Sequence, residues 1–130
     1  MLPLCRAEGI GVIPWSPLAR GFLTGNRARS GGGETVRSRT DGFAAEMYYQ
    51  DADSAVADRV ADVAHGRGVA PAQIALAWLL HEPGITAPIV GATKMFQPDE
   101  AVAALEIRLA DDEVKLLEQP YVPHPVLGHS

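Results

Sequence analysis

The sequence predicts an α/β fold in which parallel strands are covered by helices. Two short runs rich in Val and Ile, Ile10–Trp15 and Ala87–Gly91, have the length and residue types of strands. Each run is followed by a loop and then by segments with helical patterns. Such alternation is typical of parallel strands joined by helices that pack on the sheet. No internal repeat or second domain boundary is visible, so we expect a single domain.

The N-terminal third predicts a helix, a strand and a long loop. Met1–Glu8 has a helical pattern that Gly9 would end, because glycine readily adopts the left-handed conformation of a helix cap. In the strand that follows, Pro14 has no N–H group and would end the ladder of hydrogen bonds. Residues 26–41 contain three consecutive glycines and four arginines without apolar periodicity, which indicates a long loop.

Four helices are predicted after residue 50, from apolar spacing and from residues that favour helix starts. Their expected starts are Asp53 or Ser54, Pro71, Pro98 and Asp111. The segment Pro71–His81 is apolar nearly all round, as expected of a helix buried against a sheet. Ala70 precedes it where Ser or Thr would act as a cap, and a missing cap costs about 1 kcal/mol.

Composition and charge restrict the class of protein. The chain has 130 residues, of which 47% are hydrophobic and 21% charged, with a net charge of −5. Its Lys and Arg residues are scattered, so no nucleic-acid partner is expected. The longest apolar stretch, Ile74–Leu80, is too short to span a bilayer, so no membrane association is expected. The single cysteine, Cys5, and the absence of zinc-ligand spacing fit a cytoplasmic protein without a disulfide or a metal.

Two polar loops follow the two predicted strands, at the end of the strands where α/β proteins place their sites. In the first loop, a turn held by Pro17 would direct backbone N–H groups, the Ser16 hydroxyl and the Arg20 guanidinium toward an anion such as pyrophosphate. The second loop, Gly91–Lys94, would place helix-end amides and an ammonium group beside a phosphate. The spacing of each loop also fits an ordinary turn.

Taken together, Ile13–Gly21 and Gly91–Lys94 resemble the C-terminal half of an aldo-keto reductase. The resemblance also takes in Pro71–Leu80, which is similar to the helix before the last barrel strand, and the tail Pro120–Pro125. It covers residues 1–130 as one partial domain. The family fold is a (β/α)8 TIM barrel, which needs about 250 residues. The resemblance therefore implies the C-terminal part of such a barrel, roughly its last two strands with their helices.

The resemblance implies an NADPH-dependent oxidoreductase that reduces aldehydes or ketones, with this chain as its cofactor-binding part. Thr93 and Lys94 would hold the 2′-phosphate, which favours NADPH over NADH, while Gln97 and Glu100 would contact the adenine end. Ala101 stands where many relatives carry an Asn that helps to bind adenine. The implied cofactor-binding residues are Trp15, Ser16, Pro17, Leu18, Arg20, Gly91, Ala92, Thr93, Lys94, Gln97 and Glu100.

Two tryptophans and two arginines receive separate interpretations. Trp15 ends the first strand, where it would line a nicotinamide pocket, whereas Trp78 lies in the apolar helix and is expected in the core. Arg37 and Arg39 lie in the long loop. They would either close over the pyrophosphate or remain solvated charges, and the second interpretation is favoured.

No residue of the chain is assigned to catalysis. The resembled family uses a Tyr as proton donor beside Asp, Lys and His, all on earlier strands, and Tyr48, Tyr49 and Tyr121 lie outside the corresponding positions. We therefore expect the chain to be inactive alone, with a small-molecule carbonyl substrate bound by the full-length protein. A non-catalytic nucleotide-sensing or partner-binding module and a truncated product without function are the alternatives. Apolar surface left by absent strands would favour self-association or a complementing N-terminal chain.

Overall fold

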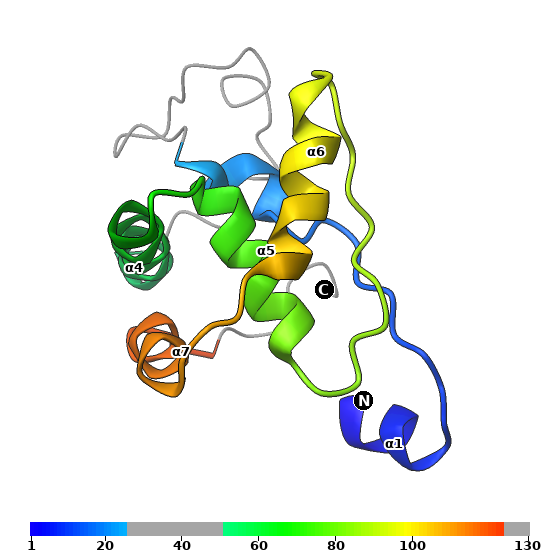
Figure 1. Cartoon of the computed structure of the whole chain (residues 1–130). Helices are drawn as coiled ribbons and strands as arrows, with labels where there is room; N and C mark the ends of the chain where they lie inside the picture. Colours follow the sequence, from blue (N-terminus) through cyan, green and yellow to red (C-terminus); the bar gives the residue numbers. More distant parts are fainter. Residues whose placement is uncertain (26–50, 124–130) are drawn as a thin grey trace.

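A computed structural model describes residues 1–25 and 51–123 (Figure 1). Arg37 and Arg39, with their expected role, and Tyr48 and Tyr49, which are assigned none, therefore lie outside the described residues. The α-helices are α1 (Leu2–Ala7), α4 (Asp51–Arg67), α5 (Pro71–His81), α6 (Phe96–Ala103) and α7 (Asp111–Glu118), and the 3-10 helices are η1 (Ala19–Thr24) and η2 (Ala104–Glu106).

The helices form close to the positions that the sequence predicts. Helix α5 begins at Pro71 and α7 begins at Asp111, as expected. Helix α4 begins at Asp51, two or three residues earlier than predicted, and α6 begins at Phe96, two residues earlier. The first helix, α1, ends as predicted before Gly9, which adopts a positive φ of 67°.

The two predicted strands are extended segments, and no strand is assigned within residues 1–25 and 51–123. Two isolated parallel bridges join them, one between Val12 and Ile85 and one between Trp15 and Ile89. The expectation of full strands is thus wrong for the described residues, although the parallel direction is as predicted. Each segment contains a proline, Pro14 or Pro88, which cannot donate to a ladder of hydrogen bonds.

Helix α5 lies at the centre of the molecule. It contacts α4, α6 and both 3-10 helices, and its Ile74 side chain is completely buried. Around Ile74 the core brings together residues of α4, α5 and α7, and the aliphatic side chain of Leu109. Trp78 is partly buried and packs against this core, and its Nε1 donates a hydrogen bond of 3.0 Å to Glu118 Oε1. The apolar character of α5 all round its circumference is explained by this central position.

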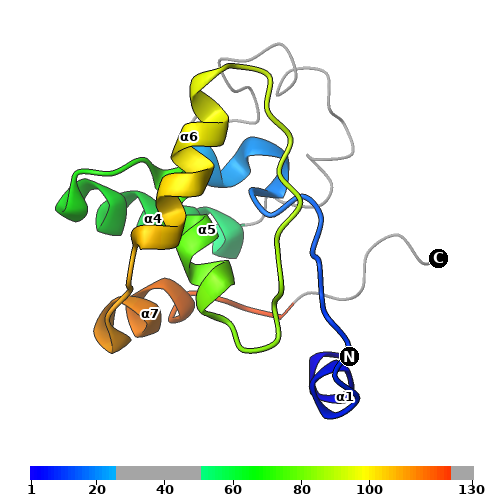
Figure 2. The same cartoon turned by 45° about the vertical axis from the view of Figure 1, so that its right-hand side comes forward.

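The helices and the extended segments occupy different sides of the molecule. The two extended segments run side by side beyond α5 and α6, and α1 lies apart from the other helices (Figures 1 and 2). Several large apolar side chains on these segments are exposed, by 69% at Trp15 and by 60% at Ile13. Ile10, Ile89 and Val90 are also exposed. We call these five residues the apolar edge.

Two helices have an alanine at the N-cap position, which cannot cap the helix with a side-chain oxygen. In each, a side chain from the first turn accepts a hydrogen bond from the N-cap N–H group instead. Gln73 Oε1 accepts a hydrogen bond of 3.0 Å from Ala70 N, at the start of α5. Glu113 Oε2 accepts one of 2.7 Å from Ala110 N, at the start of α7. This is one half of a capping box, and it offsets part of the cost that the sequence predicts for the missing cap before α5.

Glu113 also ties α7 to the end of α4. Arg67 donates from Nε to Glu113 Oε1 at 2.6 Å and from Nη2 to Glu113 Oε2 at 2.5 Å, and Nη2 donates to Arg108 O at 2.8 Å. The hydrogen bonds from Arg67 and then from Ala110 N lower the pKa of Glu113 to about 2. Such a two-pronged arginine–carboxylate pair fixes geometry as well as charge.

Replacing Glu113 by Gln is expected to lower the free energy of unfolding by about 1–2 kcal/mol at pH 7. The pKa of this carboxyl is lower in the folded state than in the unfolded state, so its contribution is complete above about pH 4.5. It is lost as the pH falls toward 2, where the wild type and Glu113→Gln should converge in urea unfolding. Asp62→Asn is the control, because the Arg59–Asp62 pair is exposed and 3.5 Å long. An equal loss in both variants would contradict this account.

Candidate functional site

The parallel direction of the two extended segments places their following loops at one end of the molecule. The segment with Val12 leads into the loop Ser16–Gly21, and the segment with Ile85 leads into the loop Gly91–Lys94. The structure therefore brings the two predicted anion-binding loops to the same end, where η1 and the first turn of α6 begin (Figure 1). This is the end at which parallel α/β folds place ligands.

A close approach at Gly11 holds the two segments together. Thr86 N donates to Val12 O at 2.8 Å, and Val12 N donates back to Thr86 Oγ1 at 3.1 Å. A Cβ atom at Gly11 would lie 2.9 Å from Thr86 Oγ1, which is too close for an ordinary contact. Glycine is required at this position because a larger side chain would push the Thr86 hydroxyl away from Val12.

The first loop is a tight turn in which three non-glycine residues have positive φ. The φ values are 53° at Ser16, 48° at Ala19 and 56° at Arg20. Each such residue costs about 1 kcal/mol, so the turn is held by its surroundings. Ser16 O accepts from Ala19 N at 2.9 Å, and Ser16 Oγ accepts from Arg20 N at 3.3 Å.

The other predicted residues of this region lie around the turn. Pro17 and Leu18 are half-buried, and Leu18 packs against the core. Arg20 is half-buried, while Trp15 is exposed. The turn is therefore anchored on the helical layer through Leu18. The sequence does not reveal the positive φ values, because Ser, Ala and Arg have no preference for them.

The second loop is exposed and is tied to the first turn of α6. Gly91, Ala92, Thr93 and Lys94 are all exposed. Gln97 Oε1 accepts hydrogen bonds from Thr93 N at 2.7 Å and from Lys94 N at 3.0 Å, and it lies 3.4 Å from Thr93 Oγ1. Of the backbone N–H groups that the predicted loop would offer to a phosphate, those of Thr93 and Lys94 are thus paired with Gln97 in this structure.

Two further side chains complete the description of this loop. Lys94 Nζ lies 5.7 Å from the centre of the Phe96 ring, within the range of a cation–π interaction. Glu100 is half-buried in α6. Sequence reasoning missed the bonds from Gln97 to the loop. The available signal was a Gln three residues after Lys94 at a helix start, which is the spacing of a capping box.

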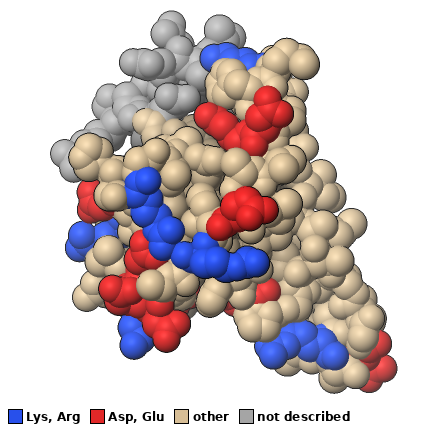
Figure 3. All heavy atoms as spheres, viewed as in Figure 1, with Lys and Arg blue, Asp and Glu red and all other residues tan. Residues whose placement is uncertain are grey.

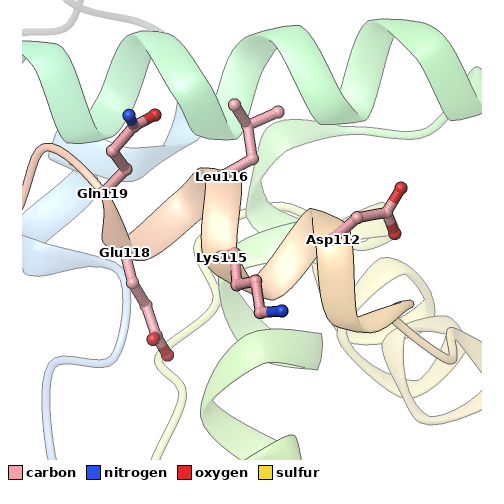
Figure 4. Close-up of a pocket in the computed structure, with 5 residues that line it drawn as sticks. All are labelled: Asp112, Lys115, Leu116, Glu118 and Gln119. Atoms are coloured by element: carbon pink, nitrogen blue, oxygen red, sulfur yellow. The ribbon is translucent and has the colours of Figure 1, made fainter.

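A hollow beside α7 is not a second site. It is lined by Asp112, Lys115, Leu116, Glu118 and Gln119. Figure 4 shows Leu116 and Gln119 pointing to one side of the helix and Lys115 and Glu118 to the other, so their polar groups do not converge. Glu118 Oε1 is already paired with Trp78 Nε1.

Other kinds of site find little support in the part of the chain that the structure describes. Within residues 1–25 and 51–123, no three His, Cys, Asp or Glu side chains are placed to share a metal ion. The face in Figure 3 shows Lys and Arg interspersed with Asp and Glu, without a large basic patch. None of the described helices combines the length and the apolar character that crossing a membrane requires.

Residues 1–121 match the sequence model of the aldo/keto reductase family. The chain belongs to the aldo/keto reductase family. This confirms the resemblance carried by the two loops and by the helix Pro71–Leu80. The family is one of oxidoreductases, and its members generally use NAD(P)H.

The relatives within the aldo/keto reductase family are longer than this chain. A Schizosaccharomyces pombe protein described as "Putative aryl-alcohol dehydrogenase" is 41% identical over 128 residues, which are 98% of this chain and 35% of that protein. Versiconal hemiacetal acetate reductase of Aspergillus parasiticus is 38% identical, over 97% of this chain and 36% of its own length. The chain thus spans about a third of the length of these curated relatives.

A solved structure shows the shared fold. The glycerol dehydrogenase AKR11B4 from Gluconobacter oxydans matches 100% of this chain and 40% of its own chain, with a TM-score of 0.72 and 24% sequence identity. The chain is therefore similar over its whole length to a part of an aldo-keto reductase barrel.

The close approach of Gly11 and Thr86 suggests a substitution that should weaken the pairing of the two extended segments. Gly11→Ala is expected to lower the free energy of unfolding by about 1 kcal/mol, because the added Cβ displaces the Thr86 hydroxyl that Val12 N uses. Gly66→Ala in α4 is the control, since its Cβ would meet nothing within 4 Å and should be slightly stabilising. Urea unfolding monitored by circular dichroism measures both, and equal stability of Gly11→Ala and wild type would contradict the account.

Proposed function

We propose that the two extended segments of this chain take the places of the last two strands of a (β/α)8 barrel, beside its closing helices, and that the chain binds NADPH in an oxidoreductase that reduces aldehydes or ketones. The observation that carries the proposal is the parallel pairing of the segments at Val12–Ile85 and Trp15–Ile89. It places an arginine-containing turn and a lysine-containing loop at the same end of the fold. Membership of the aldo/keto reductase family indicates the class of reaction. The polar groups of the two loops indicate which cofactor would bind.

The first loop suits the pyrophosphate of the cofactor. Ser16 Oγ accepts its bond from Arg20 N, so the hydroxyl hydrogen remains as a donor for a phosphate oxygen. The Arg20 guanidinium brings positive charge to the same turn, and planar guanidinium groups match phosphate oxygens well. Trp15, at the end of the extended segment, offers an exposed aromatic face on which the nicotinamide would stack.

The second loop suits the 2′-phosphate that distinguishes NADPH from NADH. Thr93 and Lys94 are exposed there and provide one hydroxyl and one ammonium group. A phosphate dianion is bound well by such a pair, because charged donors form stronger hydrogen bonds than neutral ones. In the proposed arrangement Glu100 of α6 would contact the adenine end of the cofactor, whereas Gln97 Oε1 is already bonded to the loop.

In the proposed reaction this chain holds the cofactor, and the proton donor belongs to another part of the protein. When bound, NADPH supplies a hydride to the carbonyl carbon of the substrate. The residues of the two loops fix the phosphates and thereby orient the nicotinamide. Tyr121, on the described tail, is 62% exposed, and we do not assign it as a catalytic acid.

The apolar edge is the surface on which the remaining strands of the barrel would pack. In a closed barrel the side chains of all the strands fill the interior together, so two segments alone leave such residues uncovered. The exposure of Ile10 and Ile13 supports this proposal, while Trp15 at the end of the apolar edge is left for the nicotinamide. In solution without those strands, a second copy of the chain would cover the same residues.

The proposal for Lys94 is tested by comparing two cofactors. Lys94→Ala is expected to weaken NADPH binding about tenfold, because one charge-assisted contact to the 2′-phosphate is lost. NADH has no 2′-phosphate, so its affinity should not change. Titration calorimetry, with the fluorescence of Trp15 as a second readout, measures both.

The control for this experiment is Lys115→Ala, which removes a lysine of α7 outside both loops. It should leave both affinities unchanged. Equal weakening of NADPH and NADH by Lys94→Ala would show that Lys94 does not contact the 2′-phosphate. Absence of saturable NADPH binding by the wild type would contradict the proposed function.

The apolar edge predicts self-association of the purified chain. Size-exclusion chromatography with light scattering should show a mass that rises with protein concentration, and Ile13→Lys should shift it toward the monomer. Leu4→Lys is the matched control, because Leu4 is similarly exposed but lies on α1, outside the apolar edge. A monomeric wild type at all concentrations would contradict the prediction.

A further inference from the structure

We infer that Gln97 is a positioning residue that turns the backbone N–H groups of Thr93 and Lys94 inward, so that a phosphate is bound there by the side chains of these two residues. The inference rests on the proposed binding of NADPH and adds a division of roles within the loop. The backbone would shape the loop, and the two side chains would bind the anion.

The hydrogen bonds of Gln97 account for the backbone N–H groups of Thr93 and Lys94. Its Oε1 accepts from Thr93 N at 2.7 Å and from Lys94 N at 3.0 Å. An amide oxygen has two lone pairs, so these two bonds use its acceptor capacity. In return, Gln97 N donates to Lys94 O at 3.2 Å. Both the side chain and the backbone of Gln97 are thus hydrogen-bonded to the loop.

Gln97 is less exposed to solvent than the residues to which it is hydrogen-bonded. Gln97 is half-buried, whereas each residue of Gly91–Phe96 is exposed. A phosphate that approaches from solvent therefore meets the side chains of Thr93 and Lys94 first. To reach the backbone N–H groups it would have to break both bonds to Gln97.

The two side chains remain suited to binding an anion. Thr93 Oγ1 lies 3.4 Å from Gln97 Oε1, at the outer limit of a hydrogen bond, so its hydroxyl is only weakly engaged. Lys94 Nζ lies over the Phe96 ring at 5.7 Å, and within residues 1–25 and 51–123 no carboxylate forms an ion pair with it. An ammonium on an aromatic face keeps its charge available to a phosphate.

The test uses two substitutions at Gln97 with different consequences. Gln97→Met keeps the length of the side chain and removes the acceptor oxygen, whereas Gln97→Glu keeps an acceptor oxygen. Hydrogen exchange of the Thr93 and Lys94 amides is measured by NMR on the full chain without cofactor. We expect exchange at least several-fold faster in Gln97→Met and near-wild-type protection in Gln97→Glu. Gln119→Met, the same change at the residue that follows α7, should leave these amides unaffected.

The affinity for cofactor gives the second readout. Gln97→Met should weaken NADPH binding about three- to tenfold and leave NADH binding unchanged, because only the 2′-phosphate uses this loop. A purely structural role would instead lower both affinities together with the thermal midpoint of unfolding.

Each remaining outcome overturns a stated part of the account. Unchanged amide exchange in Gln97→Met would show that Gln97 does not hold the loop. Faster exchange with tighter NADPH binding would show that the phosphate uses the backbone N–H groups and that Gln97 competes with it. Faster exchange with unchanged NADPH binding would show that Gln97 does not position the loop for the cofactor. Failure of the proposed function itself is seen separately, as equal or absent binding of NADPH and NADH by the wild type.

Discussion

Burial of helix α5 is the constraint on which the other elements depend. Its Ile74 has no exposed surface, and α4, α6, η1 and η2 all contact the helix. Burying apolar surface in this way provides most of the stabilisation of a small domain. Leu18 connects this core to the first loop, and α6, packed on α5, carries the second loop at its start. The positions of both loops thus follow from the packing of one helix.

Helices were more predictable from the sequence than strands, for a physical reason. Helices α5 and α7 are specified locally, by Pro71 at one start and by three acidic residues at the other. A strand requires a partner, and whether one is available depends on residues far away in the chain. Here Pro14 and Pro88 limit the pairing to two isolated bridges. The sequence indicated an extended, parallel pair but not how few hydrogen bonds would join it.

The candidate site was predictable in its residue types but not in its internal bonding. Arg20 and Lys94 were identifiable because cations placed after predicted strands point to anion binding. The positive φ values of Ser16 and Ala19 were not, since they result from packing around the turn. The bonds from Gln97 to Thr93 and Lys94 depend on the rotamer of one side chain, which no periodic pattern encodes. The sequence therefore identified the side chains of the candidate site, whereas tertiary contacts determine which hydrogen bonds they form.

The choice of an uncharged acceptor at position 97 has an electrostatic consequence for the second loop. A carboxylate would pair with the N–H groups of Thr93 and Lys94 more strongly than an amide does. It would also place a negative charge beside the lysine and oppose the approach of a phosphate. The Gln97 amide satisfies the same donors without changing the net charge of the loop. The ammonium of Lys94 then acts on an incoming anion without an added negative charge from position 97, although Asp99 lies in the first turn of α6.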